Sequence, residues 1–256
     1  MQLIIPAYNE ANRLPRTLAA LRRRLSQTPV PGGLEVVVVD NASDDATAAV
    51  ARTADCPAMP VRVVHCARRG KGAAVRRGIE VTTHPVVGFM DADGATDLRA
   101  LTDALRLIDA GADIAIGSRA APGAVITERH SRLRAWGAGG YRRLARRIVP
   151  DVGDTQCGFK VIRGDLARSL FARTRSDGFS FDVELLGRAH RAGARIAEFP
   201  VSWVDVPGST FSPTRHGVNS FASLAAIGWR LRERPAIVTV RDLPVADLPL
   251  LAVADA

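Results

Sequence analysis

Cysteine is scarce in this chain: Cys56, Cys66 and Cys157 are the only three among 256 residues. None belongs to a C-x-x-C or similar spacing, so the sequence offers neither a disulfide framework nor a zinc site. A chain with no disulfide pattern is typical of a reducing compartment, and we expect a cytoplasmic protein.

Long hydrophobic runs are also missing. No apolar segment approaches the ~20 residues that are needed to span a bilayer. Met1 leads directly into a short strand-like run and then into charged residues, which is not the pattern of a signal peptide. If the protein binds a membrane, we expect it to bind peripherally, at the membrane surface.

Negative charge is in deficit, because 26 Asp and Glu stand against 35 Lys and Arg, for a net charge of +9. This excess predicts attraction to an anionic partner such as a nucleotide, a nucleic acid or an acidic membrane surface. The apolar content of 47% is ordinary for a chain that buries a core. We find no internal repeat or linker, so we expect one domain over residues 1–234 and leave the tail, 235–256, unassigned.

Short β-branched runs followed by polar residues alternate with amphipathic helical patterns in the first half of the chain. Strands are expected at about 2–5, 35–39, 61–65, 86–90 and 113–119, with helices at about 14–25, 48–54, up to 79, and 98–110. We expect the first strand to stop at Pro6. This alternation predicts an α/β fold with a doubly wound, mostly parallel sheet, whose ligand lies beyond the carboxyl ends of the strands.

The second half shows a mixed pattern. A short strand is expected at 161–162, helices at 165–171 and 182–192, and an edge strand over 195–203, since Pro200 cannot donate to a central ladder. Phe221, Leu224, Ile227 and Leu231 recur at helical spacing and predict a C-terminal amphipathic helix.

Two aspartates, Asp91 and Asp93, follow the apolar run 86–90 and precede a glycine. Carboxylates one residue apart at a strand end can share a divalent cation, and such a cation commonly also holds a substrate diphosphate. Taken alone, the pattern is more typical of a solvated turn in which Asp97 caps the next helix.

A glycine-rich turn, Gly70-Lys71-Gly72, enters a helix and offers backbone N–H groups and a cation to an anion. It has neither the Walker spacing nor the dinucleotide G-x-G-x-x-G spacing. An ordinary glycine-rich turn explains it as well.

A basic segment with no acidic residue runs from 129 to 149. Its arginines alternate with apolar side chains, as in segments that lie on anionic lipid. A helix that covers the sheet with a solvated arginine face is the alternative, and RNA binding lacks a supporting signature. The residues proposed for the lipid surface are Arg129, Arg132, Arg134, Trp136, Arg142 and Arg143.

Four motifs in order resemble the family 2 inverting glycosyltransferases of GT-A fold. They are Pro-Ala-Tyr-Asn-Glu at 6–10, Val-Val-Asp-Asn-Ala-Ser-Asp-Asp-Ala-Thr at 38–47, Arg-Gly-Lys-Gly at 69–72 and Asp-Ala-Asp-Gly at 91–94. The segments 154–160, 181–186, 201–203 and 208–209 further resemble the dolichyl-phosphate or polyprenyl-phosphate β-glucosyltransferases and the related mannose synthases. The resemblance covers residues 4 to about 232.

The resemblance implies a role for each matching position. For the nucleotide sugar it implies Pro6, Tyr8, Glu10, Asp40, Lys71, Asp91 and Asp93. For the metal, Mg²⁺ or Mn²⁺, it implies Asp91 and Asp93. For catalysis it implies Asp93, Arg119 on phosphate, and Gln156 with Asp182 on the sugar and acceptor side. To these we add Asp154, a carboxylate available as a base. The nucleotide-sugar half is about 1–119 and the acceptor half about 120–234.

The chain also departs from the family pattern. Asn41 stands where a second acid is usual, and Ala42 and Ala46 replace glycines of that turn. Ala95 occupies the place of a third metal ligand found in some mannose synthases, so water or substrate is expected there.

The nucleophile decides whether a base is needed. A phosphate monoester, with a second pKa of about 6, is already anionic at neutral pH, whereas a sugar hydroxyl needs a general base, for which Asp154 is available. The resemblance implies glucose from UDP-glucose as the donor, and we expect its β-linked transfer to a polyprenyl phosphate at the inner face of the plasma membrane, with no nucleic-acid partner. The alternatives are a family 2 glycosyltransferase for a soluble acceptor and a non-catalytic nucleotide-binding or nucleic-acid-binding protein.

Overall fold

The computed structural model describes residues 1–127, 132–204, 206 and 213–232. Its strands are β1 (Gln2–Ala7), β2 (Glu35–Asp40), β3 (Val61–His65), β4 (Val86–Phe89), β5 (Ile114–Ser118), β6 (Val125–Thr127), β7 (Lys160–Arg163), β8 (Ile196–Pro200) and β9 (Ser202–Val204). Its helices are α1 (Leu14–Gln27), α2 (Thr47–Arg52), α3 (Lys71–Glu80), α4 (Ala100–Asp109), α5 (Arg132–Ala145), α6 (Gly164–Phe171), α7 (Phe181–Arg191) and α8 (Pro213–Arg232).

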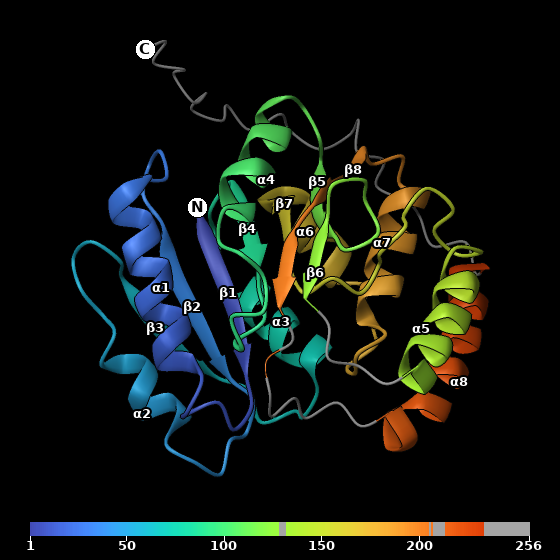
Figure 1. Ribbon diagram of the computed structural model, residues 1–256, viewed down its shortest axis with the longest axis horizontal. Coiled ribbons are helices and arrows are strands. Elements are labelled where there is room, and N and C mark those ends of the chain that lie inside the picture. The colour runs from blue at the N-terminus through green and yellow to red at the C-terminus, as the bar shows by residue number, and fades with distance from the viewer. Residues whose placement is uncertain (128–131, 205, 207–212, 233–256) are drawn as a thin grey trace.

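One sheet of seven strands, in the order β3-β2-β1-β4-β7-β5-β8, forms the centre of the molecule (Figure 1). β7 runs antiparallel to both of its neighbours, β4 and β5, and the other pairings in this sheet are parallel. β6 and β9 pair separately as a two-stranded sheet. The expected mostly parallel α/β sheet is confirmed.

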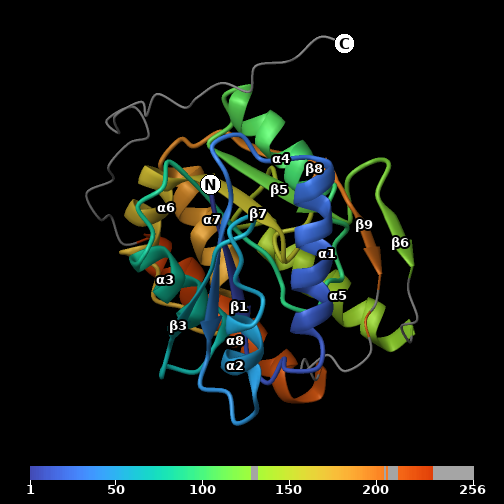
Figure 2. The same ribbon diagram turned by 90° about the vertical axis from the view of Figure 1, so that its left-hand side faces the viewer.

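Helices cover both faces of the sheet because successive strand residues point to opposite sides. In β2, Val36 and Val38 pack with α1, α2 and α4, whereas Val37 and Val39 pack with the face covered by α3, α6 and α7. Figure 2 shows α1 on one side of the sheet and α3 and α6 on the other.

The carboxyl ends of β1, β2, β4 and β5 lie at one edge of the sheet, since these strands run in the same direction. The antiparallel β7 begins at that same edge, so the loop that leads into Lys160 also arrives there. This topology brings segments from both halves of the chain together at a single edge.

The expected stop of the first strand at Pro6 is wrong, since β1 continues to Ala7. Pairing of β1 with β4 ends at Ile4, whereas pairing with β2 continues to the end of β1. Pro6 therefore lies past the end of the β4 ladder, where a missing N–H removes no partner.

The expected edge strand over 195–203 is half right. β8 does lie at the edge of the large sheet, but the chain leaves that sheet at Val201 and continues as β9 in the small one. β9 also touches the loop after β4, because the N–H of Val204 donates to the carbonyl of Ala95 at 2.9 Å.

The C-terminal helix α8 lies beside α5 at the right of Figure 1 and also contacts α7. Leu224, Ile227 and Leu231 are buried as the pattern predicts, whereas Phe221 remains 40% exposed at the end of that stripe. In the part of the chain that the structure describes, no helix combines the length and the apolar character needed to cross a membrane.

Candidate active site

Strand ends bring five of the predicted nucleotide-sugar residues to one edge of the sheet. Glu10 follows β1, Asp40 ends β2, Lys71 opens α3 after β3, and Asp91 and Asp93 follow β4. The negative charges of Asp91 and Asp93 act on both Glu10 and Lys71, which shows that these side chains lie close together.

Asp91 lies between a lysine and a glycine. Lys71 Nζ is 2.5 Å from Asp91 Oδ1. On the other side, a Cβ atom at Gly158 would lie 1.9 Å from Asp91 Oδ2, so a glycine is needed there to leave room for the carboxylate. Burial alone would lower the pKa of Lys71, but the negative charges of Asp91, Asp182 and Asp93 outweigh burial and raise that pKa. Lys71 is therefore a permanently charged partner of Asp91.

The turn before α3 positions Lys71. Gly70 has a φ of +130°, a conformation that favours glycine, and a Cβ there would lie 2.3 Å from the carbonyl oxygen of Asp177. Asn41 holds the same turn: its Oδ1 accepts the N–H of Gly70 at 2.7 Å and its Nδ2 donates to the carbonyl of Arg68 at 2.6 Å. An aspartate could not make the second bond, which explains an amide at position 41.

Negative charge accumulates around Asp93. Burial, with the nearby charge of Asp91, raises the pKa of Asp93. Burial also raises the pKa of Glu10, although hydrogen bonds from Arg13 oppose the shift. Raised pKa values at neighbouring carboxylates mark a place where an added cation is favourable.

The donor set suits a hard divalent cation held by oxygen ligands. Among the side chains that are described, no cluster of three His, Cys, Asp or Glu is placed to hold a metal ion. Asp91 and Asp93 would therefore supply two carboxylates, and water or substrate would complete the shell. The alanine at position 95 agrees with that arrangement.

Pro6, Tyr8 and Asp40 lie at the adjoining ends of β1 and β2. Asp40 Oδ2 is 3.4 Å from Nδ1 of His65, on the next strand. The guanidinium carbon of Arg69 is 5.5 Å from the centre of the Tyr8 ring. The three predicted residues are thus neighbours, next to His65 and Arg69, to which the sequence assigned no role.

The turn after Asp40 keeps the shape that glycines usually allow. Ala42 has a φ of +55°, in the left-handed region, so alanine adopts the strained conformation there. Ala46 has a negative φ of −79° and needs no glycine.

Arg119 and Asp154 form a bidentate ion pair. Arg119 Nε donates to Asp154 Oδ2 at 2.7 Å and Nη2 donates to Oδ1 at 2.9 Å, while the backbone N–H of Arg119 reaches Oδ2 at 3.1 Å. Burial would raise the pKa of Asp154, but the hydrogen bonds and charge of Arg119 outweigh it and hold this pKa below its usual range. The Arg119 guanidinium also lies over the ring of Trp203, 5.5 Å from its centre. Two predicted catalytic residues are therefore locked together.

Asp182 is held in the interior by Lys160. Lys160 Nζ donates to Asp182 Oδ1 at 2.6 Å and to the carbonyl of Cys157 at 2.7 Å, and both charged side chains are fully buried. Burial raises the pKa of Asp182, against the opposing charges of Lys160 and Lys71. Gln156, which was predicted to share the acceptor side with Asp182, is half-buried. Of the two, Gln156 has surface available to a ligand.

Sequence reasoning assigned no role to Lys160 or Gly158. A lysine in the apolar run 159–162 was a usable signal, because a lysine inside a central strand requires a buried carboxylate. Gly158 carried no such signal, since its function depends on Asp91, which is distant in the chain.

The predicted lipid-facing residues belong to α5 and the segment before it. Arg142 and Arg143 are exposed on the last turn of α5. Outside the described part of the structure lie Arg129 and the side chains of Arg132, Arg134 and Trp136. A solvated arginine face is thus observed, and its contact with lipid stays a prediction.

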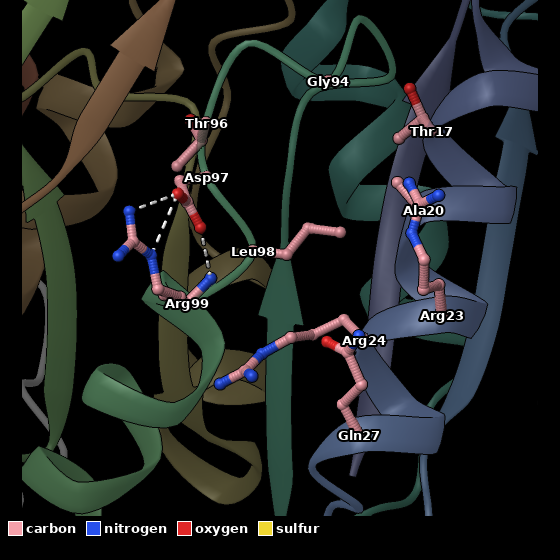
Figure 3. A pocket seen from close by; sticks show the side chains of 10 residues that line it. All are labelled: Thr17, Ala20, Arg23, Arg24, Gln27, Gly94, Thr96, Asp97, Leu98 and Arg99. Atoms are coloured by element: carbon pink, nitrogen blue, oxygen red, sulfur yellow. Dashed lines mark hydrogen bonds and ion pairs between the residues drawn. The ribbon is translucent and has the colours of Figure 1, made fainter.

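A cleft of about 400 Å³ opens between α1 and the loop before α4 (Figure 3). Arg23 and Arg24 of α1 line one side, and Asp97, hydrogen-bonded to Arg99, lines the other. None of the predicted nucleotide-sugar residues is part of its lining. Its lining includes Gly94, which follows Asp93 directly, but neither member of the aspartate pair.

Known proteins are similar to this chain in sequence. The family model described as Glycosyl transferase family 2 matches residues 2–171. Glycosyltransferase AglD of Haloferax volcanii is 31% identical over 257 residues, which cover 99% of this chain and 41% of AglD. The dolichyl-phosphate beta-glucosyltransferase of Drosophila melanogaster is 37% identical over 229 residues, which cover 83% of this chain and 69% of that protein. The chain thus spans less than half the length of AglD.

A solved structure extends the comparison to the backbone. Glucosyl-3-phosphoglycerate synthase from Mycobacterium tuberculosis, in complex with Mn²⁺, UDP and phosphoglyceric acid, matches with a TM-score of 0.65 at 19% identity, over 92% of this chain and 79% of that chain. This similarity confirms the GT-A fold that the sequence resemblance implied. Because the family model covers more than half of the chain, including the aspartate pair, the chain is a glycosyltransferase and belongs to glycosyl transferase family 2.

Proposed function

We propose that this enzyme transfers glucose from UDP-glucose to the phosphate of a polyprenyl phosphate, with inversion to a β linkage. Relatives named dolichyl-phosphate beta-glucosyltransferase, from Dictyostelium discoideum, Drosophila melanogaster and Homo sapiens, support the sugar and the acceptor. UDP and Mn²⁺, bound in the solved structure of the same fold, support the donor nucleotide and the metal.

On the donor side, Asp91 and Asp93 would hold Mg²⁺ or Mn²⁺. The cation supplies positive charge to the nucleoside diphosphate that leaves the anomeric carbon. Lys71 adds a fixed positive charge next to Asp91, in a partly buried place where charge interacts strongly. Tyr8 and Asp40 would face the base and the ribose, at the ends of β1 and β2.

The Arg119–Asp154 pair supports a phosphate acceptor over a sugar hydroxyl. A general base works best with a pKa near the working pH, whereas the pKa of Asp154 is held below its usual range and both of its oxygens bind Arg119. Asp154 is therefore suited to orient Arg119 and poorly suited to deprotonate a sugar hydroxyl. A phosphate monoester, with a second pKa of about 6, requires no base and gains from a positioned guanidinium.

We place the enzyme peripherally on the inner face of the plasma membrane. Arg142 and Arg143 are exposed on α5, and Arg146 and Arg147 extend that basic surface just beyond the helix. Each arginine near an anionic leaflet contributes about 1 kcal/mol of attraction. Such binding would bring the active site to an acceptor that stays in the bilayer.

Labelled-sugar transfer tests the proposal. The purified chain is incubated with Mn²⁺, radiolabelled UDP-glucose and vesicles that contain a polyprenyl phosphate, and label in the organic extract is counted. We expect a labelled lipid phosphate, a β anomeric signal in the NMR spectrum of the product, and lower yields with UDP-GlcNAc, UDP-galactose or GDP-mannose.

Asp154→Asn separates this acceptor from a soluble one. If Asp154 serves as a base, its loss removes the acid limb of the pH–rate profile together with most of the activity. If Asp154 orients Arg119, activity falls while the profile above pH 5 keeps its shape. Failure to label any lipid with any of the four donors contradicts the proposal.

A further inference from the structure

Glu198, on the edge strand β8, binds the backbone that carries Asp154. Its Oε2 accepts the N–H of Gly153 at 2.8 Å and its Oε1 accepts the N–H of Asp154 at 3.0 Å. One carboxylate thus satisfies two consecutive backbone donors. Neither the motifs nor the spacing of the sequence indicated this residue.

The register of the sheet explains how Glu198 reaches that turn. β8 runs parallel to β5, and Glu198 pairs with Ile116, the middle residue of β5. Arg119 follows β5 directly, so Glu198 and Arg119 reach the turn at 153–154 from two adjacent strands. The loop 153–154 is therefore held from β8 on one side and from β5 on the other.

The contacts form a chain that ends at the guanidinium. Glu198 holds the backbone of Asp154, and Asp154 holds Arg119 through three hydrogen bonds. The Arg119 guanidinium rests on Trp203, which follows Glu198 on the same stretch of chain. A shift of the Asp154 backbone would therefore move the guanidinium off its place.

We infer that Glu198 is a positioning residue of the transfer reaction, acting on Arg119 through Asp154. The inference rests on the proposed contact of Arg119 with phosphate. Only a carboxylate offers two acceptor oxygens to the paired N–H groups, since a glutamine would present an N–H₂ group to one of them. A misplacement of about 1 Å in a catalytic group can cost about 100-fold in rate, so the effect should appear in kcat.

Glu198→Gln is the main test variant, and Glu35→Gln, on β2 and away from the site, is its matched control. We expect kcat to fall about 10- to 100-fold in Glu198→Gln, with the KM for UDP-glucose changed less than threefold, since misplaced groups slow the reaction more than donor binding. Glu35→Gln should keep both values. Glu198→Asp, which retains two oxygens on a shorter stem, should recover part of the rate.

A double-mutant cycle distinguishes positioning from a general loss of structure. If Glu198 acts through Asp154, Glu198→Gln costs less than threefold when it is introduced into Asp154→Asn, because the carboxylate of Asp154, through which Glu198 acts on Arg119, is already gone. Additive losses, or a loss that only follows the fraction of unfolded protein in a melting curve, overturn the inference.

One readout needs no lipid acceptor and keeps this test separate from the proposed function, because hydrogen exchange reports the amides of Gly153 and Asp154 directly. We expect faster exchange at both amides in Glu198→Gln. Unchanged exchange in a folded variant overturns the role of Glu198 even if lipid is the true acceptor. Absence of lipid product in the wild type, with faster exchange in the variant, overturns only the acceptor.

Discussion

The two sides of the site handle charge in opposite ways. On the donor side, Asp91 and Asp93 are half-buried, with Lys71 as a close cation, and burial together with their mutual repulsion raises the pKa of Asp93. On the acceptor side, Asp154 is paired at both oxygens with Arg119, so that no charge is left over.

This difference separates binding from positioning. Excess negative charge is unstable alone and becomes favourable when a divalent cation and a diphosphate arrive, so the donor side is built to bind. A fully paired carboxylate gains nothing from another cation and instead fixes the geometry of its partner. The predictions below test each side of the comparison.

The largest effect should come from Asp93→Asn. Removal of one carboxylate from the donor side weakens the hold on the cation, and loss of comparable charge stabilisation in enzymes costs about 100- to 1,000-fold in rate. Transfer assays and Mn²⁺-dependent thermal shifts with UDP measure the loss. Asp97→Asn, which changes the same charge a few residues away in a pair with Arg99, should keep activity. Equal losses in both variants would contradict the donor-side assignment.

Lys160→Met, on the acceptor side, should strongly lower the free energy of unfolding of the protein. It leaves Asp182 buried without a partner, and breaking a buried pair in this way costs about 3–5 kcal/mol in the free energy of unfolding. Urea denaturation gives the value. The double variant Lys160→Met/Asp182→Leu should recover much of it, because an apolar pair needs no charge compensation. A double variant as unstable as the single one would show that the ion pair is not the cause.

Gly158→Ala should damage the donor side without unfolding the protein. The added methyl group would collide with Asp91 and displace its carboxylate, and we expect roughly a 100-fold loss of kcat. Gly178→Ala is the matched control, since a Cβ there meets nothing within 4 Å. An active Gly158→Ala enzyme would show that the position of Asp91 is not critical.

The pH dependence of the free energy of unfolding should report the ion pair between Asp154 and Arg119. Its folded pKa is lowered, so the stability it contributes is present above its unfolded pKa of about 3.9 and is lost as the pH falls through the folded value. The wild type should exceed Asp154→Asn in free energy of unfolding by about 1.5–3 kcal/mol, the usual range for hydrogen bonds to a charged group. This difference should stay constant from pH 8 to about 5 and shrink below about pH 4. Denaturation curves at several pH values measure this difference. A difference that instead grows on acidification would contradict the pairing.

The smallest effect should come from the basic surface outside the site. Arg142→Gln with Arg143→Gln removes two charges worth about 1 kcal/mol each near an anionic leaflet, so vesicle binding should weaken roughly 10- to 30-fold. Sedimentation with anionic vesicles measures the change. Arg16→Gln with Arg22→Gln removes the same charge from the exposed side of α1 and should leave binding unchanged if α5 faces the lipid. Equal weakening in both double variants would show that vesicle binding depends only on the net charge of the protein.

Strand and helix positions were largely predictable because their signals are local. The β-branched run at 35–39 and the leucine spacing of 14–25 match β2 and α1 closely. Pro6 misled the prediction because the cost of a missing N–H depends on whether a neighbouring strand is present at that level, and β4 no longer pairs there.

The contacts of the site also divide into those that a local pattern of residues predicts and those that depend on tertiary structure. The sequence by itself determined that Asp40, Lys71 and the aspartate pair follow successive strands, and parallel strands must end at one edge, so their meeting could be predicted. Only the tertiary structure decided that Gly158 makes room for Asp91, that Lys160 neutralises Asp182, and that Glu198 holds the Asp154 turn. These contacts join residues far apart in the chain across an antiparallel strand and an edge strand, and no local pattern of residues specifies such a pairing.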